Sequence, residues 1–209
     1  MHSDIKTQFL LEVQQSYLSY LSIKKNMHMG DSTDLRKAME CATPMYHFGE
    51  HLADYLSKDF NKEFNEEIKR DCSDYSLLKD VVNVHKHRKI NRGKISLSNI
   101  NQVQEVLCII EFKDFIGKYT EAEKMILLTL DDGRERDLLE VLTNVINNYY
   151  TLMVKYKILK EPKHFKYNRD VIIPRANDHN GIAKMNLFAT SGTKPTFTFR
   201  MEKYNYEKK

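Results

Sequence analysis

The sequence predicts a mainly α-helical fold: a helical bundle over residues 1–159 that carries one β-hairpin near residues 102–136, followed by a small β-rich C-terminal extension over residues 160–209. Apolar residues recur every three or four positions through most of the bundle, which is the period of an amphipathic helix. The hairpin region is instead rich in β-branched and apolar residues, and Asp132–Gly133 is a strong hairpin-turn signal. The extension is rich in Pro, Asn, Gly, Thr and Lys, so it either adds strands to a sheet edge or forms an arm for a partner.

Start and stop signals place five helices in the bundle. Ser3 or Asp4 can cap the first helix, and Gly30 is positioned to end it. Pro44 either kinks the second helix or begins a new one. The expected helices span residues 3–30, 32–58, 61–70, 73 to about 91–93 (capped by Ser73 or Asp74) and 136–159.

Composition favours a folded protein that stays in the cytoplasm. Of the 209 residues, 41% are hydrophobic and 30% are charged, which is typical of a globular domain and unlike a disordered chain. No apolar run is long enough to cross a bilayer, and the first residues lack the basic and then apolar order of a secretory signal. The three cysteines form no CxxC pair, so we expect neither a disulfide framework nor a cysteine zinc site. No motif indicates a cofactor.

Positive charge is concentrated in two places, although the net charge is only +4. Residues 160–209 contain eleven Lys and Arg against five Asp and Glu, whereas residues 79–94 contain six cations against one aspartate. Such clusters attract phosphates by releasing counterions, although a charge run can also be no more than a solvated helix face. The candidate nucleic-acid-binding residues are Lys79, Lys86, Arg88, Lys89 and Arg92.

Polar stripes run beside the apolar faces of two predicted helices. Asp80, Asn83 and His87 share one stripe by helical spacing, and His51 and Asp54 share the other. If the two helices pack together, these side chains can form a general acid–base site, because imidazole titrates near neutral pH and a carboxylate fixes its tautomer. The alternative is a hydrogen-bond network that pins two core helices and catalyses nothing.

The segment HFGEH matches the H-x-x-E-H pattern of a class of zinc peptidases. His47 and His51 would bind the metal, Glu50 would activate water, and Glu135 or Glu140 would supply the third ligand. A pattern with three fixed positions arises easily by chance, and the rest of the chain lacks the layout of those peptidases. We therefore expect no metal site.

Three segments carry a resemblance to a known group of proteins. The order HLADYL, LKDVVNVHKH and then TLDDGRERDLLEVLTNVINNYY resembles uncharacterised bacterial and phage proteins with HEPN-like helical domains, over roughly residues 33–155. HEPN-type domains include dimeric metal-independent ribonucleases and nucleotide-binding modules of defence and toxin systems. The resemblance therefore implies a homodimer whose ligand is RNA or a nucleotide.

The chain departs from the catalytic pattern of HEPN ribonucleases, which is an arginine followed four to six residues later by a histidine. Lys79 replaces that arginine, and lysine lacks the planar fork that stabilises a phosphorane. Lys79 and His85 fit the spacing, whereas His87 lies too far along. If the activity persists, His85 or His87 would act as the base and Asp80 would orient it.

Two functional hypotheses follow. The first is a non-catalytic HEPN-like binding protein of a bacterial or phage conflict system, which engages an anionic ligand, or a protein partner through residues 160–209. It predicts that packing closes off His51 and His87. The second is a metal-independent endoribonuclease or nucleotide-processing enzyme whose site lies between the two helices and is completed by dimerisation. It predicts that the same histidines are solvent-accessible in a cleft.

Overall fold

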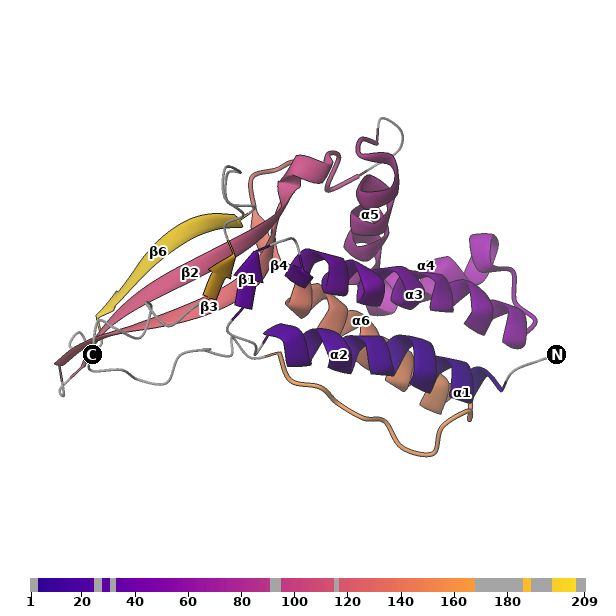
Figure 1. The fold of residues 1–209 in the computed structure, drawn as a ribbon. Coiled ribbons are helices and arrows are strands. Elements are labelled where there is room, and N and C mark those ends of the chain that lie inside the picture. Colours follow the sequence, from indigo (N-terminus) through magenta and orange to yellow (C-terminus); the bar gives the residue numbers. More distant parts are fainter. Residues whose placement is uncertain are drawn as a thin grey trace.

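A helical bundle with a long β-sheet extending from one end makes up the fold (Figure 1). The computed structural model describes residues 4–24, 28–30, 33–90, 95–114, 117–167, 186–188 and 197–205. The prediction of a mainly α-helical protein with a β-hairpin is confirmed. None of the helices in these ranges is long and apolar enough to span a membrane.

The N-terminal helix is continuous through α1 (Ile5–Gln8), a π-helical segment (Phe9–Gln14) and α2 (Gln15–Lys24). Asp4 caps it as predicted, because its carboxylate accepts a hydrogen bond from the backbone N–H of Lys6 at 3.2 Å. The predicted end at Gly30 is wrong. The helix ends at Lys24, and the short strand β1 (His28–Gly30) pairs in parallel with β5 (Asn186–Phe188) from the far end of the chain.

The other helices are α3 (Thr33–Tyr55), α4 (Asn65–Asp71) after a π-helical turn (Phe60–Phe64), α5 (Asp74–His87) and α6 (Leu138–Lys155). Pro44 lies inside α3 and does not begin a new helix. Helix α5 ends earlier than predicted, because Arg88 adopts a left-handed conformation (φ 63°). Ser73, one of the two predicted caps, is the N-cap residue, although its side chain makes no capping hydrogen bond; Asp74, the other candidate, lies inside the helix.

A cluster of aromatic side chains holds the bundle together where α1, α3, α5 and α6 meet. The ring centroids of Phe9 and Phe48 lie 5.1 Å apart, and those of Phe48 and Tyr149 lie 5.0 Å apart at a steep angle. The hydroxyl groups of Tyr75 and Tyr149 donate to backbone carbonyls of α3. Gly49 makes this close approach possible, because an added Cβ would lie 2.6 Å from the Tyr75 hydroxyl oxygen.

We expect Gly49→Ala to lower the free energy of unfolding by about 1–3 kcal/mol, the usual cost of overpacking a core. A glycine-to-alanine change inside a helix ordinarily gains up to about 1 kcal/mol, so the predicted sign is reversed by the Tyr75 contact. Urea denaturation of the purified variant measures the change. Adding Tyr75→Phe to Gly49→Ala removes the clashing hydroxyl and should recover part of the lost stability. If Gly49→Ala were more stable than wild type, the side chains around residue 49 would have to shift readily to make room for the added methyl group.

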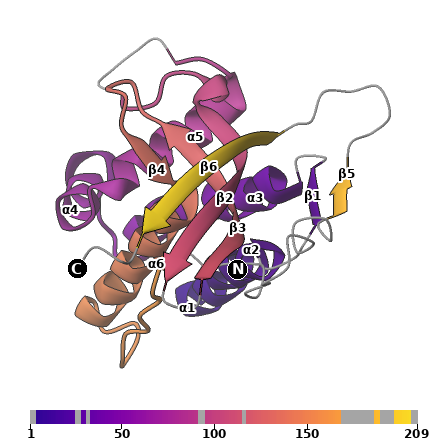
Figure 2. The ribbon, with the colours of Figure 1, turned by 90° about the vertical axis from the view of Figure 1, so that its left-hand side faces the viewer.

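The sheet has the strand order β4-β3-β2-β6 and is a meander with one added strand (Figure 2). Strands β2 (Val103–Asp114) and β3 (Gly117–Thr129) form a long antiparallel hairpin, and β4 (Glu135–Asp137) follows the Asp132–Gly133 turn. Gly133 has a φ of 84°, which explains the glycine there. Strand β6 (Phe197–Asn205) pairs in parallel with β2, so part of the C-terminal extension adds a strand to the sheet edge.

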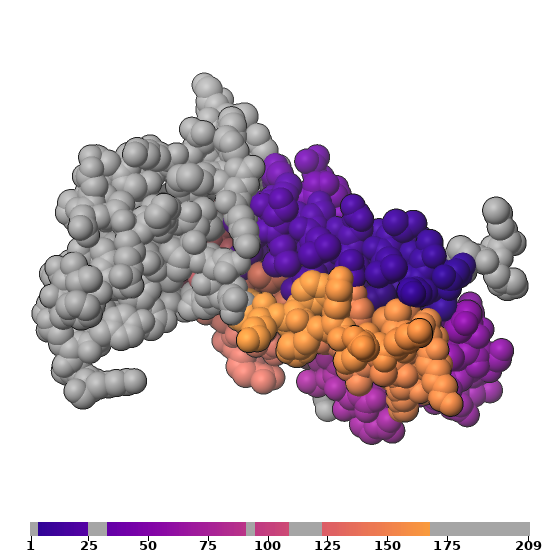
Figure 3. Space-filling model, turned by 90° about the horizontal axis from the view of Figure 1, so that it is seen from below, coloured from indigo at the N-terminus to yellow at the C-terminus, as the bar shows by residue number. Residues whose placement is uncertain are grey.

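The segment that follows α6 runs back along the bundle. Figure 3 shows it in orange beside the indigo N-terminal helix. Phe165 packs edge-on against Tyr17 with ring centroids 5.0 Å apart. Its backbone N–H and carbonyl both bond to the side-chain amide of Asn147, each at 2.8 Å. Residues up to 167 are therefore part of the bundle surface.

Candidate functional site

The C-terminal end of α5 presents a group of exposed basic residues. Lys86, Arg88 and Lys89 are all exposed, as are the histidines at positions 85 and 87. None of the three cations forms an ion pair within the described part of the chain. We call Lys86, Arg88 and Lys89 the α5 basic cluster. No carboxylate in the described ranges pairs with these cations, and an unpaired basic surface attracts phosphates.

Backbone pairing fixes the position of this cluster. The Arg88 N–H donates to the carbonyl of Val84 at 2.7 Å, and the Arg88 carbonyl accepts from the N–H of Ile100 at 2.9 Å. Lys89 forms an antiparallel β-bridge with Asn99. Cations at a helix C-terminus also interact favourably with the negative end of the helix dipole, which explains why basic residues are stable there. Two of the cluster's three cations are thus held on a paired backbone.

Asp80 anchors the loop that leads away from the cluster. Its side chain is buried, and its carboxylate accepts from the backbone N–H of Ser96 at 2.7 Å. Burial raises the pKa of the Asp80 carboxyl, and this hydrogen bond opposes the rise. Asn83 is half-buried and Lys79 is exposed. Arg92 lies outside the described residues.

The two predicted polar stripes do not come together. Helix α5 contacts α3 near Tyr46 and Gly49 through Tyr75 at its beginning, and lies against residues 39–44 through His85 at its end. The two helices therefore pass each other in opposite directions. His51 and Asp54 lie beyond Gly49, at the opposite end of α3 from His85, and within the described residues neither forms a hydrogen bond or ion pair with Asp80 or His87.

The histidines fit neither hypothesis as it was framed. His51 and His87 are both exposed, so the prediction that packing closes them off is wrong. Their exposure is what the enzyme hypothesis predicted, but the two side chains lie at different ends of the α3–α5 contact and do not share one cleft. No described acid–base pair links the two stripes.

Two side chains of the H-x-x-E-H segment meet at the surface. His47 Nδ1 lies 3.3 Å from Glu50 Oε2, and both side chains are nearly half exposed. Glu140, a candidate third ligand, pairs with Arg136 at 3.0 Å. Among the residues that the structure describes, no group of three or more His, Cys, Asp or Glu side chains is arranged to hold a metal ion.

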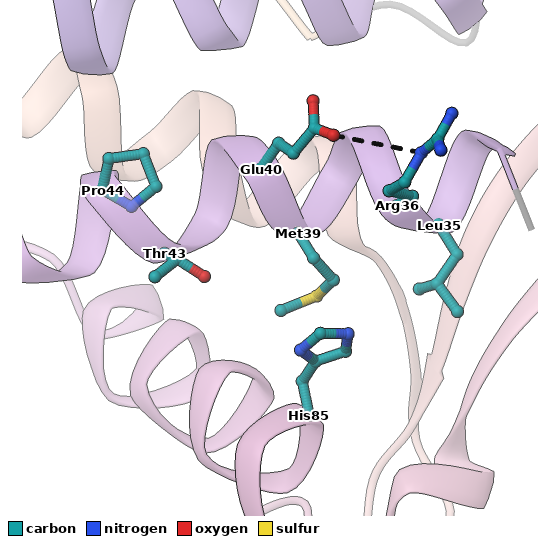
Figure 4. A pocket seen from close by; sticks show the side chains of 7 residues that line it. All are labelled: Leu35, Arg36, Met39, Glu40, Thr43, Pro44 and His85. Carbon is teal, nitrogen blue, oxygen red and sulfur yellow. Dashed lines mark ion pairs between the residues drawn. The ribbon is translucent and has the colours of Figure 1, made fainter.

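A groove that the sequence did not predict lies between α3 and α5 (Figure 4). Its volume is about 460 Å³. Met39, Thr43 and Leu35 point from α3 toward His85 of α5, while Glu40 and Arg36 form a loose ion pair at 3.9 Å on the rim. Pro44 lies at the far end of the groove. The groove is formed only when the two helices pack, so no single helical pattern indicates it.

A second unpredicted feature is a buried cluster of charges where the sheet meets the bundle. The Lys124 ammonium lies 3.0 and 2.8 Å from the two carboxylate oxygens of Asp34, and Lys24 lies 3.0 Å from Asp137 and 3.7 Å from Glu123. A sixth member, from β2, caps α3: Oε1 of Glu105 accepts from the N–H of Leu35 at 2.7 Å. We call these six residues the buried charge cluster: Lys24, Asp34, Glu105, Glu123, Lys124 and Asp137.

Burial raises the pKa of two carboxyls in this cluster, those of Asp34 and Glu105. Lys124 opposes the rise at both carboxyls, whereas the negative charge of Asp34 adds to the rise at Glu105. The Oε2 atom of Glu105 has no hydrogen-bond partner among the described residues. An acid whose pKa is raised by folding stabilises the fold at low pH, and this contribution is lost as the pH rises through the raised pKa.

We expect Glu105→Gln to raise the melting temperature by about 2–4 °C near pH 7, the shift that about 1 kcal/mol produces in a chain of this size. Glutamine keeps an acceptor for the Leu35 N–H and removes one of four negative charges that face two lysines. The advantage over wild type should shrink as the pH is lowered, because the raised pKa of the Glu105 carboxyl lets wild type take up a proton there. Thermal melts near pH 7 and in acidic buffer test this, and a variant less stable than wild type near pH 7 would contradict it.

No protein-family model, curated protein or solved structure matches this chain.

Proposed function

We propose that this protein binds RNA or a related polyanion without cleaving it, through the α5 basic cluster. The observation that carries the proposal is the exposure of Lys86, Arg88 and Lys89 on one helix end with no described carboxylate paired to them. Elsewhere in the bundle, cations such as Lys124 and Arg136 are matched by acidic partners. Unmatched cations on a fixed backbone are the usual means of holding a phosphate chain.

Geometry favours binding over catalysis at this site. A general acid and base must both reach the reacting group, whereas His51 and Asp54 lie at the other end of α3 from His87. Asp80, the proposed orienting carboxylate, is bonded to the backbone of Ser96. The lysine at position 79 also lacks the bidentate geometry of arginine.

The biological setting is proposed from the resemblance to HEPN-type domains. A cytoplasmic homodimer acting in a bacterial or phage conflict system is consistent with the α5 basic cluster, because such systems act on RNA and nucleotides. Residues 160–209 would contact a protein partner in that assembly.

A salt titration of RNA binding tests the proposal. Fluorescence anisotropy of a short labelled single-stranded oligoribonucleotide, measured in EDTA, should show saturable binding that weakens linearly on a plot of log affinity against log salt concentration. Each phosphate neutralised in a single strand contributes a slope of about −0.7, so three cations predict a slope near −2 or steeper. Absence of saturable binding at low salt would contradict the proposal.

A further inference from the structure

We propose that the groove between α3 and α5 receives an unpaired base of single-stranded RNA while the α5 basic cluster holds the neighbouring phosphates. This inference rests on the proposed function and assigns to it a second, base-specific contact surface. Its starting point is the position of His85, which lines the groove and immediately precedes Lys86. The groove and the α5 basic cluster are therefore adjacent in the sequence, at His85 and Lys86.

The groove wall has the chemistry that a flat heteroaromatic ring requires. Met39 and Leu35 supply apolar surface from α3, and a methionine thioether makes favourable contacts with aromatic rings. His85 approaches from α5 with its ring facing the end of Met39 (Figure 4). Bases of single strands commonly stack on side chains of this kind, because every base has a π-face.

Polar groups at the groove can bond to the edge of a base. Pro44 has no N–H, so it cannot donate to the carbonyl of Glu40 as a residue four positions on normally does. Glu40 and Pro44 both line the groove, which leaves a backbone acceptor there in addition to the exposed hydroxyl of Thr43. Arg36 also lines the groove, but Figure 4 shows its guanidinium turned away from His85 toward Glu40. The groove therefore combines an apolar wall with a few hydrogen-bonding groups.

Size and charge distinguish a nucleotide from other occupants. A volume of about 460 Å³ falls in the range of small-molecule sites. Three exposed cations follow His85 within four residues, so the preferred ligand carries negative charge directly beside its apolar part. A nucleotide unit of a flexible strand has this arrangement. A base-paired strand does not, because its bases are stacked and their edges are occupied.

The test compares an oligoribonucleotide with an abasic strand of the same length and backbone, both fluorescein-labelled, by anisotropy with wild-type protein. We expect the strand with bases to bind about five- to hundredfold more tightly, the range of one to a few stacked bases. Equal affinity for the two strands would overturn the groove inference and leave the proposed function standing. Failure of both strands to bind would overturn both.

A groove-filling variant gives an independent measurement. Thr43 is exposed on α3, so Thr43→Phe should fill the groove without disturbing the core, and Thr43→Ser serves as the matched control. Thr43→Phe is expected to reduce the affinity for the strand with bases to that of the abasic strand, and to leave abasic binding unchanged. An unchanged affinity in a variant that melts like wild type would overturn the inference. The inference would also be overturned if an acidic peptide bound in the groove and RNA could not displace it.

Discussion

Lys124→Met is expected to lower the free energy of unfolding by about 3–5 kcal/mol, because it leaves a buried carboxylate without its partner. The Lys124 side chain is 2% exposed and that of Asp34 is 8% exposed, with the ammonium 2.8 Å from the nearer oxygen. Lys124 also donates to the carbonyl of Ile23 at 3.1 Å, so the substitution orphans a second acceptor. Urea or thermal denaturation at neutral pH measures the change.

Two controls separate charge loss from packing. Lys37→Met removes a partly exposed cation that pairs with Glu40, and it should cost no more than about 1 kcal/mol. The double variant Lys124→Met/Asp34→Asn removes both charges and should be more stable than Lys124→Met alone, since an uncharged amide is cheaper to bury than an unpaired carboxylate. A Lys124→Met variant as stable as Lys37→Met would show that the buried charge cluster does not hold the sheet to the bundle.

The second large effect concerns RNA binding. The triple variant Lys86→Gln/Arg88→Gln/Lys89→Gln should reduce the slope of log affinity against log salt concentration by about 2, because each lost phosphate contact in a single strand accounts for about 0.7. All three side chains are exposed, so the fold should be retained. Anisotropy titrations of a single-stranded oligoribonucleotide at several salt concentrations provide the measurement.

A matched control removes the same number of charges elsewhere. Lys160, Lys163 and Lys166 are exposed cations on the segment that follows α6. Changing these three to glutamine alters the net charge equally, but should leave the salt slope close to that of wild type. If both triple variants lose affinity to the same extent, the interaction depends on overall charge and the α5 basic cluster is not the binding site.

Local sequence patterns predicted those parts of the fold that local chemistry determines. Leu138, Val141 and Tyr149 lie on one face of α6 and are all buried, as their helical spacing indicated. The Asp132–Gly133 turn was also correctly identified, because a left-handed glycine is needed to connect β3 with β4. Both features depend on neighbours within a few residues.

Helix ends were less predictable because distant residues determine them. Lys24 is the last residue of α2 and binds Asp137, the N-cap residue of α6, which lies more than a hundred positions later in the sequence. The helix was predicted to continue to Gly30, but His28–Gly30 instead form β1, whose partner β5 lies near the C-terminus. Likewise, Asp74 would be a good N-cap in isolation, but its carboxylate instead accepts two hydrogen bonds from Arg136 and one from Asn144.

The candidate site was predicted in part. The exposed cations at the end of α5 follow directly from the charge run in the sequence. Whether His51 meets His87 depends instead on the relative direction in which α3 and α5 pack, and neither helix's own sequence determines that direction. The buried charge cluster was missed because its members come from several elements. A lysine or glutamate within a predicted strand is expected to be exposed unless a partner of opposite charge is known. Glu105 and Lys124, which interrupt apolar strands, are the only local signals of that cluster that the described residues offer.

The most direct test of binding without cleavage is one incubation of wild-type protein with a mixed-sequence single-stranded RNA in EDTA, resolved on native and denaturing gels in parallel. We expect a shifted complex on the native gel and full-length RNA on the denaturing gel. RNA cleavage by wild type, lost in His51→Ala or His87→Ala variants that still melt cooperatively, would contradict this account and assign the histidines a catalytic role.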